Sequence, residues 1–234
     1  ATRGTTNTNR LRRVDRWIAR HPALRTAESP VVVDLGFGAS GVTAFELEAR
    51  LRKAHSGVSV WGLEIDPDRV ATARTQLEAT RAGRTSFSPD ARVSFARGGF
   101  EVPLPGGVPA TVIRAFNVLR QYDESDVAQA WHLMASRLHP GGIVVEGTCD
   151  EIGRVCTWIE VGDNSVPRSL TLSLRLAELE SPLIAAERLP KALIHRNVAG
   201  EGVHSFLRAL DTEWTRAVAA SSFGPQQRWR AAIT

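Results

Sequence analysis

The stretch that decides the fold spans residues 31–41 and reads VVVDLGFGASG. Its β-branched start, residues 31–33, is typical of a strand that is buried on both faces of a parallel sheet. The glycines at 36, 38 and 41 then allow a tight turn and let a ligand come close to the backbone. Open α/β sheets bind ligands at the carboxyl ends of their strands. The stretch therefore predicts a ligand site as well as a fold.

Strand-like and helix-like patterns alternate around this stretch. Strands are expected over residues 58–65, 93–96, 111–118 and 143–146, and helices over residues 42–55, 66–82 and 126–138. Because strands that alternate with helices pair in parallel, the pattern predicts a parallel sheet that is covered on both faces. After Gly153 two further strands, 155–161 and 169–176, are separated by a short loop, and such a brief connection predicts an antiparallel pair.

Both ends of the chain are predicted to be helical. Apolar residues recur at helical spacing in an N-terminal helix that is expected to end near Pro22: Leu11, Val14, Trp17 and Ile18. A C-terminal helix is expected over residues 203–219, with four side chains facing inward: Phe206, Leu207, Leu210 and Trp214. We therefore divide the chain into a basic N-terminal helix that caps the same domain (1–27), a core (28–176) and a helical C-terminal extension (177–234).

The composition excludes several classes of protein. Of the 234 residues, 43% are hydrophobic and 23% are charged, which is typical of a soluble globular domain and not of a disordered or collagen-like chain. No stretch approaches the roughly 20 apolar residues of a membrane helix. The chain has two cysteines, Cys149 and Cys156, too few for a disulfide framework, so a cytoplasmic location is expected.

Positive charge is concentrated at the two ends of the chain. Residues 1–27 carry a net charge of +6 and residues 186–234 a net charge of +3, whereas the part between them carries −5. Two interpretations are open: these ends are solvated helix faces, or they approach an anionic partner such as nucleic acid.

Two classes of ligand fit the glycine loop. Gly36, Gly38 and Gly41 match the G-x-G-x-x-G pattern of dinucleotide-binding proteins, and Glu64 follows 23 residues after Gly41. This spacing fits an NAD(P)-dependent oxidoreductase. Asp34, two residues before the first glycine, is not part of that pattern. A carboxylate there is unfavourable beside a pyrophosphate and favours a cationic or amino-bearing ligand.

The same residues resemble the class I S-adenosylmethionine-dependent methyltransferases. Asp34, Gly36 and Gly38 match the family's acid followed by alternate glycines, with Ser40 where a third glycine is usual. Residues 62–64, Gly-Leu-Glu, match the family's second motif, whose acid binds both ribose hydroxyls. The resemblance covers residues 28–176. It implies a transferase that uses S-adenosylmethionine and leaves S-adenosylhomocysteine as product.

Three further stretches support the resemblance. Residues 138–142 match the turn before the family's fifth strand, and residues 116–119 resemble the stretch after its fourth strand. The antiparallel pair after Gly153 fits the family's reversed last strand. The fold implied is a Rossmann-like three-layer α/β sandwich. Its sheet is mostly parallel with an antiparallel last strand, and helical additions lie at both ends of the chain.

The resemblance also implies which residues bind the cofactor. The family often has an acid after the third strand that bonds the adenine amino group, but Gly99 stands there in this chain, followed by Phe100. The adenine is therefore expected to contact backbone and aromatic groups at this position, and Ile65 on another side. The full set of expected cofactor-binding residues is Asp34, Gly36, Phe37, Gly38, Ser40, Glu64, Ile65, Gly99, Phe100 and Asn117.

The methyl acceptor is expected beyond the fourth and fifth strands. Methyl transfer to oxygen or nitrogen needs alignment and the loss of a proton, so few catalytic groups suffice. The candidate catalytic side chains are Asn117, Tyr122, Cys149 and His195. Residues 116–119 lack the two prolines found in enzymes that methylate the amino groups of bases.

Cys149 has a second interpretation. Thr148-Cys149 resembles the Thr-Cys of RNA cytosine-C5 methyltransferases, in which a thiolate adds to the base. Those enzymes also carry a Pro-Cys after the fourth strand, which this chain lacks. O- or N-methylation is therefore favoured over C-methylation, and Cys149 is interpreted as a buried, inert thiol. No Cys/His cluster has the spacing of a zinc site, so no metal is expected.

The class of acceptor stays open at this stage. An RNA acceptor would use the arginine-rich N-terminus, whereas a small molecule would need a closed apolar pocket, capped by residues 1–20 and 181–200. Two other functions are also kept: an NAD(P)-dependent oxidoreductase, and a methyltransferase-like module that binds without turnover. The sequence indicates no membrane partner and sets no oligomeric state.

Overall fold

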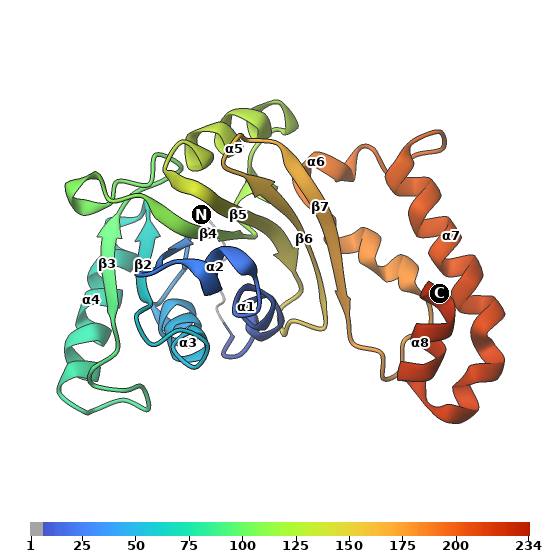
Figure 1. The fold of residues 1–234 in the computed structure, drawn as a ribbon, viewed down its shortest axis with the longest axis horizontal. Helices are drawn as coiled ribbons and strands as arrows, with labels where there is room; N and C mark the ends of the chain where they lie inside the picture. The colour runs from blue at the N-terminus through green and yellow to red at the C-terminus, as the bar shows by residue number, and fades with distance from the viewer. Residues whose placement is uncertain (1–6) are drawn as a thin grey trace.

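A seven-stranded sheet in the order β3-β2-β1-β4-β5-β6-β7 forms the centre of the computed structural model, which describes residues 7–234 (Figure 1). The strands are β1 (Val31–Leu35), β2 (Ser59–Glu64), β3 (Val93–Arg97), β4 (Ala110–Phe116), β5 (Leu138–Cys149), β6 (Val155–Gly162) and β7 (Pro167–Leu174). β1 to β5 are parallel, and β6 runs antiparallel to both of its neighbours. The predicted parallel sheet with an antiparallel end is confirmed. The reversed strand is β6, and β7 forms the edge outside it.

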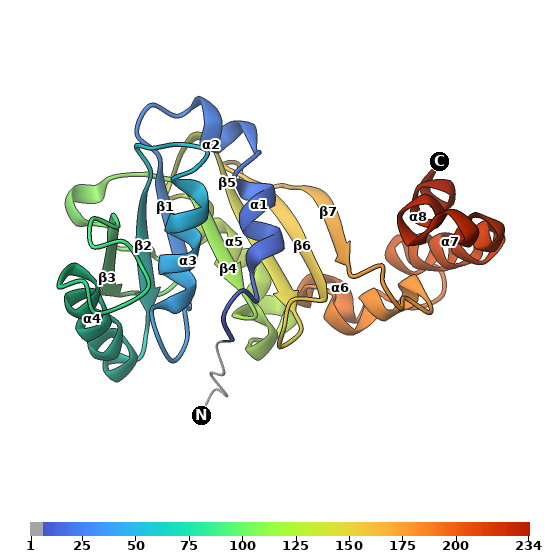
Figure 2. The ribbon, with the colours of Figure 1, turned by 90° about the horizontal axis from the view of Figure 1, so that it is seen from below.

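Helices cover both faces of this sheet (Figures 1 and 2). The helices over the sheet are α1 (Arg12–Ile18), α2 (Pro22–Thr26), α3 (Val42–Leu51), α4 (Pro67–Arg81) and α5 (Val127–Ala135). The C-terminal helices that follow β7 are α6 (Lys191–Ile194), α7 (Gly202–Arg216) and α8 (Pro225–Ile233). Short 3-10 helices are η1 (Pro105–Gly107), η2 (Leu119–Gln121), η3 (Glu124–Asp126), η4 (Pro182–Arg188) and η5 (Ala217–Phe223). Within residues 7–234 no helix combines the length and the apolar character needed to cross a membrane. The first six residues of the predicted segment 1–27 lie outside the described residues.

The central strands are apolar on both faces because both faces are covered. In β1, Val32 packs into the cluster on the side of α1 and α3, while Val33 packs into the cluster on the side of α5. Both side chains are buried, which explains the unbroken β-branched run that predicted this strand. The structure is therefore the predicted three-layer α/β sandwich.

Two helix starts follow from their capping residues. The Asp66 carboxylate accepts hydrogen bonds from the backbone N–H groups of Asp68 (2.9 Å) and Arg69 (3.3 Å), and Pro67 occupies the first turn, so α4 begins where it was predicted. Proline acts in the same way at Pro22. The prediction that a helix ends there is only partly right, because a second short helix, α2, begins at this proline.

The boundary between α5 and β5 differs from the prediction. The helix was expected to reach residue 138 and the strand to begin at 143, but α5 ends at Ala135 and β5 begins at Leu138. The start of β4 explains the difference. The Ala110 N–H donates to the Arg137 carbonyl (2.8 Å), and Ala110 pairs with Leu138 in the ladder. These backbone hydrogen bonds hold the chain extended in a stretch whose local pattern favours a helix.

The C-terminal helices pack on the β6–β7 end of the sheet, and Figures 1 and 2 show α7 and α8 beyond the β7 edge. A small cluster joins them to the strands: Val155, Leu174, Ala185, Leu189 and Leu207. On α7, Leu207, Leu210 and Trp214 are buried as predicted. Phe206 was also expected to face inward, but it is 48% exposed, because the buried stripe of α7 is narrow and Phe206 lies outside it.

A buried ion-pair network joins α1 to the sheet. Asp34 and Arg114 are direct neighbours in the β1–β4 ladder, and the Arg114 Nη2 atom lies 2.8 Å from Asp34 Oδ2. The Arg114 Nη1 atom donates to Asp15 of α1, which also pairs with Arg50 of α3 at 2.5 Å. Arg114 and Asp15 are both 0% exposed. Burial raises the pKa of Asp15, against the lowering effect of Arg114 and Arg50.

Removing one member of this network leaves an uncompensated charge in the core. We expect Asp15→Ala to lower the free energy of unfolding by about 3–5 kcal/mol, because Arg114 then loses a buried partner. Urea unfolding followed by circular dichroism measures the effect. Arg16→Gln, an exposed position on the same helix, is the control and should change stability by no more than about 0.5 kcal/mol. A loss below about 1 kcal/mol in Asp15→Ala would show that the network does not hold α1 in place.

Candidate functional site

The candidate site lies at the carboxyl ends of β1, β2 and β4, where the predicted glycine loop leaves the sheet. Gly36 and Gly38 both have positive φ, +69° and +86°, which a residue with a side chain rarely adopts. A Cβ on Gly36 would also lie 2.6 Å from the Cγ2 atom of Val118. These two glycines are therefore required by the turn itself, and they leave its backbone open to the pocket.

Glu64 closes the back of this loop. It is the last residue of β2 and is buried. Its Oε2 atom accepts from the Gly38 N–H (3.2 Å) and lies 3.6 Å from Arg69 Nη1, while its Oε1 atom accepts from the Ile65 N–H (2.9 Å). The Asp66 N–H also donates to Oε1 (3.4 Å). A carboxylate has about four acceptor positions, so these three backbone donors leave Glu64 about one position, beside Arg69. The acid and the loop are thus held together as one unit.

Asp34 lines the pocket, but its charge is balanced from behind. Its Oδ2 atom accepts from the Thr43 hydroxyl (2.7 Å), and its Oδ1 atom accepts from Arg114 Nε (3.1 Å). Although burial lowers the pKa of Arg114, Asp34 and Asp15 raise it overall, so this guanidinium stays charged. The carboxylate therefore exerts a weaker attraction on a cationic ligand than its position in the sequence suggests.

Asn117 and Cys149 form the part of the site that follows β4 and β5. Asn117 has φ +61°, a left-handed conformation that asparagine tolerates better than most residues. Its Oδ1 atom accepts from the Cys149 N–H (3.1 Å), and its Nδ2 atom lies 3.6 Å from the Cys149 Sγ atom. The Arg10 Nη2 atom donates to the Cys149 carbonyl (3.0 Å). The N-terminal segment is thereby attached to the rim of the site.

The two cysteines are unoxidised neighbours on adjacent strands. Cys149 of β5 pairs with Cys156 of β6 in the antiparallel ladder, and both are buried. The hydrogen bond from Cys156 lowers the pKa of Cys149 to about 7, with Arg10 and Asn117 acting in the same direction against the effect of burial. The same hydrogen bond raises the pKa of Cys156. Of the pair, Cys149 is therefore the thiol that loses its proton more readily.

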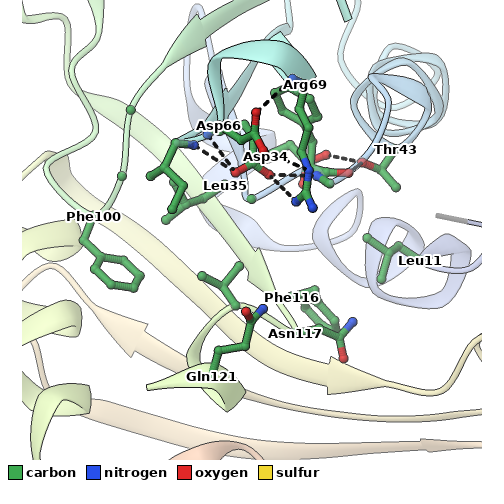
Figure 3. Close-up of a pocket in the computed structure, with 18 of the residues that line it drawn as sticks. Leu11, Asp34, Leu35, Thr43, Asp66, Arg69, Phe100, Phe116, Asn117 and Gln121 are labelled. Atoms are coloured by element: carbon green, nitrogen blue, oxygen red, sulfur yellow. Dashed lines mark hydrogen bonds and ion pairs between the residues drawn. The ribbon is translucent and has the colours of Figure 1, made fainter. Parts of the chain in front are cut away.

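These groups surround one pocket with a volume of about 320 Å³. Figure 3 shows Asp34 and Gln121 on opposite sides of it, with Phe100 at one end and Leu11 at the other. The rings of Phe100 and Tyr122 meet edge to face at 5.1 Å and form an aromatic wall. The cavity thus has a glycine-rich polar side and an aromatic side, as small-molecule sites commonly do.

Most of the residues that the sequence singled out line this pocket. They are Asp34, Gly36, Phe37, Gly38, Glu64, Ile65, Gly99, Phe100 and Asn117, together with the acceptor-side candidates Tyr122 and Cys149. Ser40 and His195 are not among the lining residues. The His195 Nδ1 atom lies 2.7 Å from Glu124 Oε2 on an exposed surface. In residues 7–234 no group of three or more His, Cys, Asp or Glu residues is placed to hold a metal.

Gln121, which follows the fourth strand on the expected acceptor side, also lines the pocket. Several other lining residues were not anticipated from the sequence: Arg10, Leu11, Thr43, Asp66, Arg69 and Arg188. The sequence does mark the partner of Asp34, because Arg114 is the one charged residue of β4, whose other residues are apolar apart from Thr111. It also marks Asp15, as the sole acid of the arginine-rich N-terminal segment. No feature of the sequence marks Arg10 and Arg188 as pocket residues, because only the folded chain brings them to the same cavity.

No protein-family model and no curated protein sequence matches the chain. Solved structures with similar folds include an O-methyltransferase family protein from Burkholderia thailandensis, at 18% identity over 59% of this chain and 37% of that one, with a TM-score of 0.42. Another is magnesium protoporphyrin IX methyltransferase (ChlM) from Synechocystis PCC 6803 with bound SAH, at 15% identity over 58% and 53% with a TM-score of 0.44. A third is the [4+2]-cyclase SpnF, at 20% identity over 58% and 44% with a TM-score of 0.41. The chain spans less than two thirds of the length of each.

The thiol pair gives a prediction for pH dependence. The ultraviolet thiolate absorbance of the native protein should rise with pH around a midpoint near pH 7, because Cys149 loses its proton there. Cys156→Ala should move the midpoint upward, since the S–H donor that stabilises the thiolate is lost. Cys149→Ala is the control and should remove the transition. A midpoint near the ordinary thiol value of about 8.5 in the native protein would contradict the prediction.

Proposed function

We propose that the chain is an S-adenosylmethionine-dependent methyltransferase of the class I, Rossmann-like type. The observation that carries the proposal is the unit formed by the glycine loop and Glu64. Two glycines with positive φ present their backbone to the pocket, and a buried carboxylate at the end of the neighbouring strand faces the same cavity. This arrangement suits a nucleoside whose ribose offers two adjacent hydroxyls to one carboxylate.

The residues present fit an adenosyl group. Glu64 keeps about one acceptor position for a ribose hydroxyl, and a second hydroxyl would replace one of its three backbone donors. A Cβ on Gly36 would meet Val118, so the loop depends on the absence of side chains. We assign the adenine to the end of the pocket with Ile65, Gly99 and Phe100. Ile65 is 58% exposed, which leaves an apolar surface for a flat ring.

The opposite end of the pocket suits the amino-acid part of the cofactor. Arg10 supplies a positive charge there, which favours a carboxylate, and Asn117 supplies a polar side chain that is held by Cys149. Asp34 remains the proposed partner of the amino group, with its attraction moderated by Arg114. When bound, S-adenosylmethionine supplies an electrophilic methyl group on a sulfonium and becomes S-adenosylhomocysteine on transfer.

The chain's own residues would then align the acceptor and exclude water. We assign the acceptor to the side of the pocket with Gln121, Tyr122 and Arg188, with O- or N-methylation favoured. Asn117, Tyr122 and Cys149 stay candidate catalytic residues because they line the cavity, whereas His195 lies outside it and is the weakest candidate. A small-molecule acceptor fits the cavity better than an RNA strand.

The proposal assigns a part to each segment of the chain. Residues 28–176 form the cofactor-binding core. The described part of the N-terminal segment, residues 7–27, caps this core, since Arg10 and Leu11 line the pocket, and the C-terminal extension 177–234 contributes Arg188. The two free cysteines agree with a reducing, cytoplasmic setting, which we include in the proposal.

One observation favours a second candidate, an NAD(P)-dependent oxidoreductase. The sequence argues against a pyrophosphate because Asp34 would repel it, but Arg114 balances that charge in the folded protein. Arg69 beside Glu64 also adds a cation near the expected ribose position. The two candidates therefore differ in the cofactor bound, which a direct measurement decides. A module that binds without turnover would bind the same cofactor and differ only in activity.

Titration calorimetry with S-adenosylhomocysteine tests the proposal. We expect binding by the native chain, and a loss of about 1–3 kcal/mol of binding free energy in Glu64→Ala because the ribose loses its acceptor. Glu78→Gln, an exposed position on α4, is the matched control and should bind like the native chain. Circular dichroism checks that each variant is folded.

Parallel titrations with NADH and NADPH separate the two cofactors. A folded chain that fails to bind S-adenosylhomocysteine would overturn the methyltransferase proposal. Tight binding of a reduced nicotinamide nucleotide, weakened by Glu64→Ala, would favour the oxidoreductase in its place.

A further inference from the structure

Two arginines from distant parts of the chain meet beside the acceptor side of the pocket. Arg120, in η2, donates from its Nη1 atom to the Glu187 carbonyl of η4 (2.9 Å). The next residue, Arg188, lines the pocket. Burial and then the charge of Arg188 lower the pKa of Arg120, so the two guanidinium groups repel each other. Two like charges held close together disfavour the folded state. Such arrangements are concentrated at functional sites.

The position of Arg188 is built into the fold. The Thr157 hydroxyl of β6 donates to the Arg188 carbonyl (2.5 Å), and Leu189, the next residue, is buried against the strands. Earlier in η4, Ala185 is fully buried in the same cluster. The end of η4 is therefore anchored at its backbone and on both sides of Arg188, and the guanidinium is presented from a rigid element.

The carboxylates near Arg120 and Arg188 offset the positive charge of these two side chains only weakly. Glu151 is the carboxylate that pairs with Arg188, at a separation of 3.8 Å, and its side chain is 69% exposed, so solvent screens the interaction. The backbone carbonyl of Glu187 accepts a hydrogen bond from Arg120, whereas the Glu187 carboxylate side chain is exposed. Glu124 is already paired with His195 at 2.7 Å. The acceptor side of the pocket thus keeps a positive potential.

The surroundings of this positive side favour a small molecule with an aromatic or apolar body. Phe100 and Tyr122 form the adjoining wall, and Figure 3 shows Gln121 pointing into the cavity. Two of the N-terminal arginines are used differently. Arg10 donates to the carbonyls of Cys149, at the end of β5, and Asp150, and Arg12 donates to the Ile152 carbonyl, which ties their segment to the core.

We propose that the acceptor carries an anionic group, a carboxylate or a phosphate, which Arg188 binds with Arg120 beside it. This inference rests on the proposed function, because the acceptor is assigned to the same pocket. Arg188 is then the residue that selects the substrate class. It binds the anion in the bidentate manner that guanidinium groups provide, while the aromatic wall contacts the body of the molecule.

Fluorine NMR on the protein saturated with S-adenosylhomocysteine tests the proposal with matched probes. The probes are para-fluorobenzoate, its neutral isostere para-fluorobenzamide, and para-fluorophenyl phosphate. We expect at least one of the two anions to bind about tenfold or more tightly than the amide, as a charge-assisted hydrogen bond implies. The comparison of benzoate with phosphate distinguishes the two sources of anionic oxygen.

Variants assign this preference to the arginine pair. Arg188→Gln should abolish the preference for the anion, and Arg120→Gln should reduce that preference, each measured on protein saturated with S-adenosylhomocysteine. Arg168→Gln is the control, because Arg168 pairs with Asp163 at the far end of the β6–β7 hairpin. Equal affinity for the anions and the amide, or a preference that survives in Arg188→Gln, would overturn the proposal.

Two further outcomes are distinct from these. An RNA oligonucleotide that binds more tightly than both anions and loses its affinity in Arg188→Gln would overturn the small-molecule class and assign a nucleic-acid acceptor to the same arginine. If S-adenosylhomocysteine itself does not bind, the proposed function fails first. The anion preference is then measured on the free protein, where the absence of any preference overturns this inference independently.

Discussion

The buried contact of Arg114 with Asp15 and Asp34 is the interaction on which the rest of the structure depends. It joins the first helix, the first strand and the fourth strand through one guanidinium that is 0% exposed. A charge in that position is tolerable only because two carboxylates and the Thr43 carbonyl surround it. The same contact sets the electrostatics of the pocket, since Asp34 faces the cavity with its charge already balanced. The same residues therefore hold α1 against the sheet and set the charge on one side of the pocket.

The pocket combines parts of different origin. One side is a glycine loop held against Glu64 by a hydrogen bond from the Gly38 N–H to the Glu64 carboxylate. The other side is assembled from the N-terminal segment, the loop after β4 and the end of η4. The two sides are built by separate segments, so substitutions in one segment can change its side of the pocket without altering the residues of the other side.

Much of the architecture was predictable, and the exceptions have physical causes. The apolar runs predicted the five parallel strands, and Asp66 followed by proline predicted the start of α4. Both signals lie within a few residues of the element that they define. The end of α5 was not predictable, because the chain from Leu138 is held extended by hydrogen bonds to β4. The direction of Phe206 was missed because an apolar residue beside a narrow buried stripe has the same local pattern as one within it.

For the site, the sequence by itself determined the glycine loop and the acid that follows it on the next strand. Gly36, Gly38 and Glu64 are marked by spacing, and parallel pairing necessarily brings the ends of neighbouring strands together. Only the tertiary structure decided that Asp34 is balanced by Arg114, and that Arg120 and Arg188 meet beside the pocket. The reason is that charge balance depends on which groups are neighbours in space. Residues 68 positions apart leave no trace of that contact in the sequence.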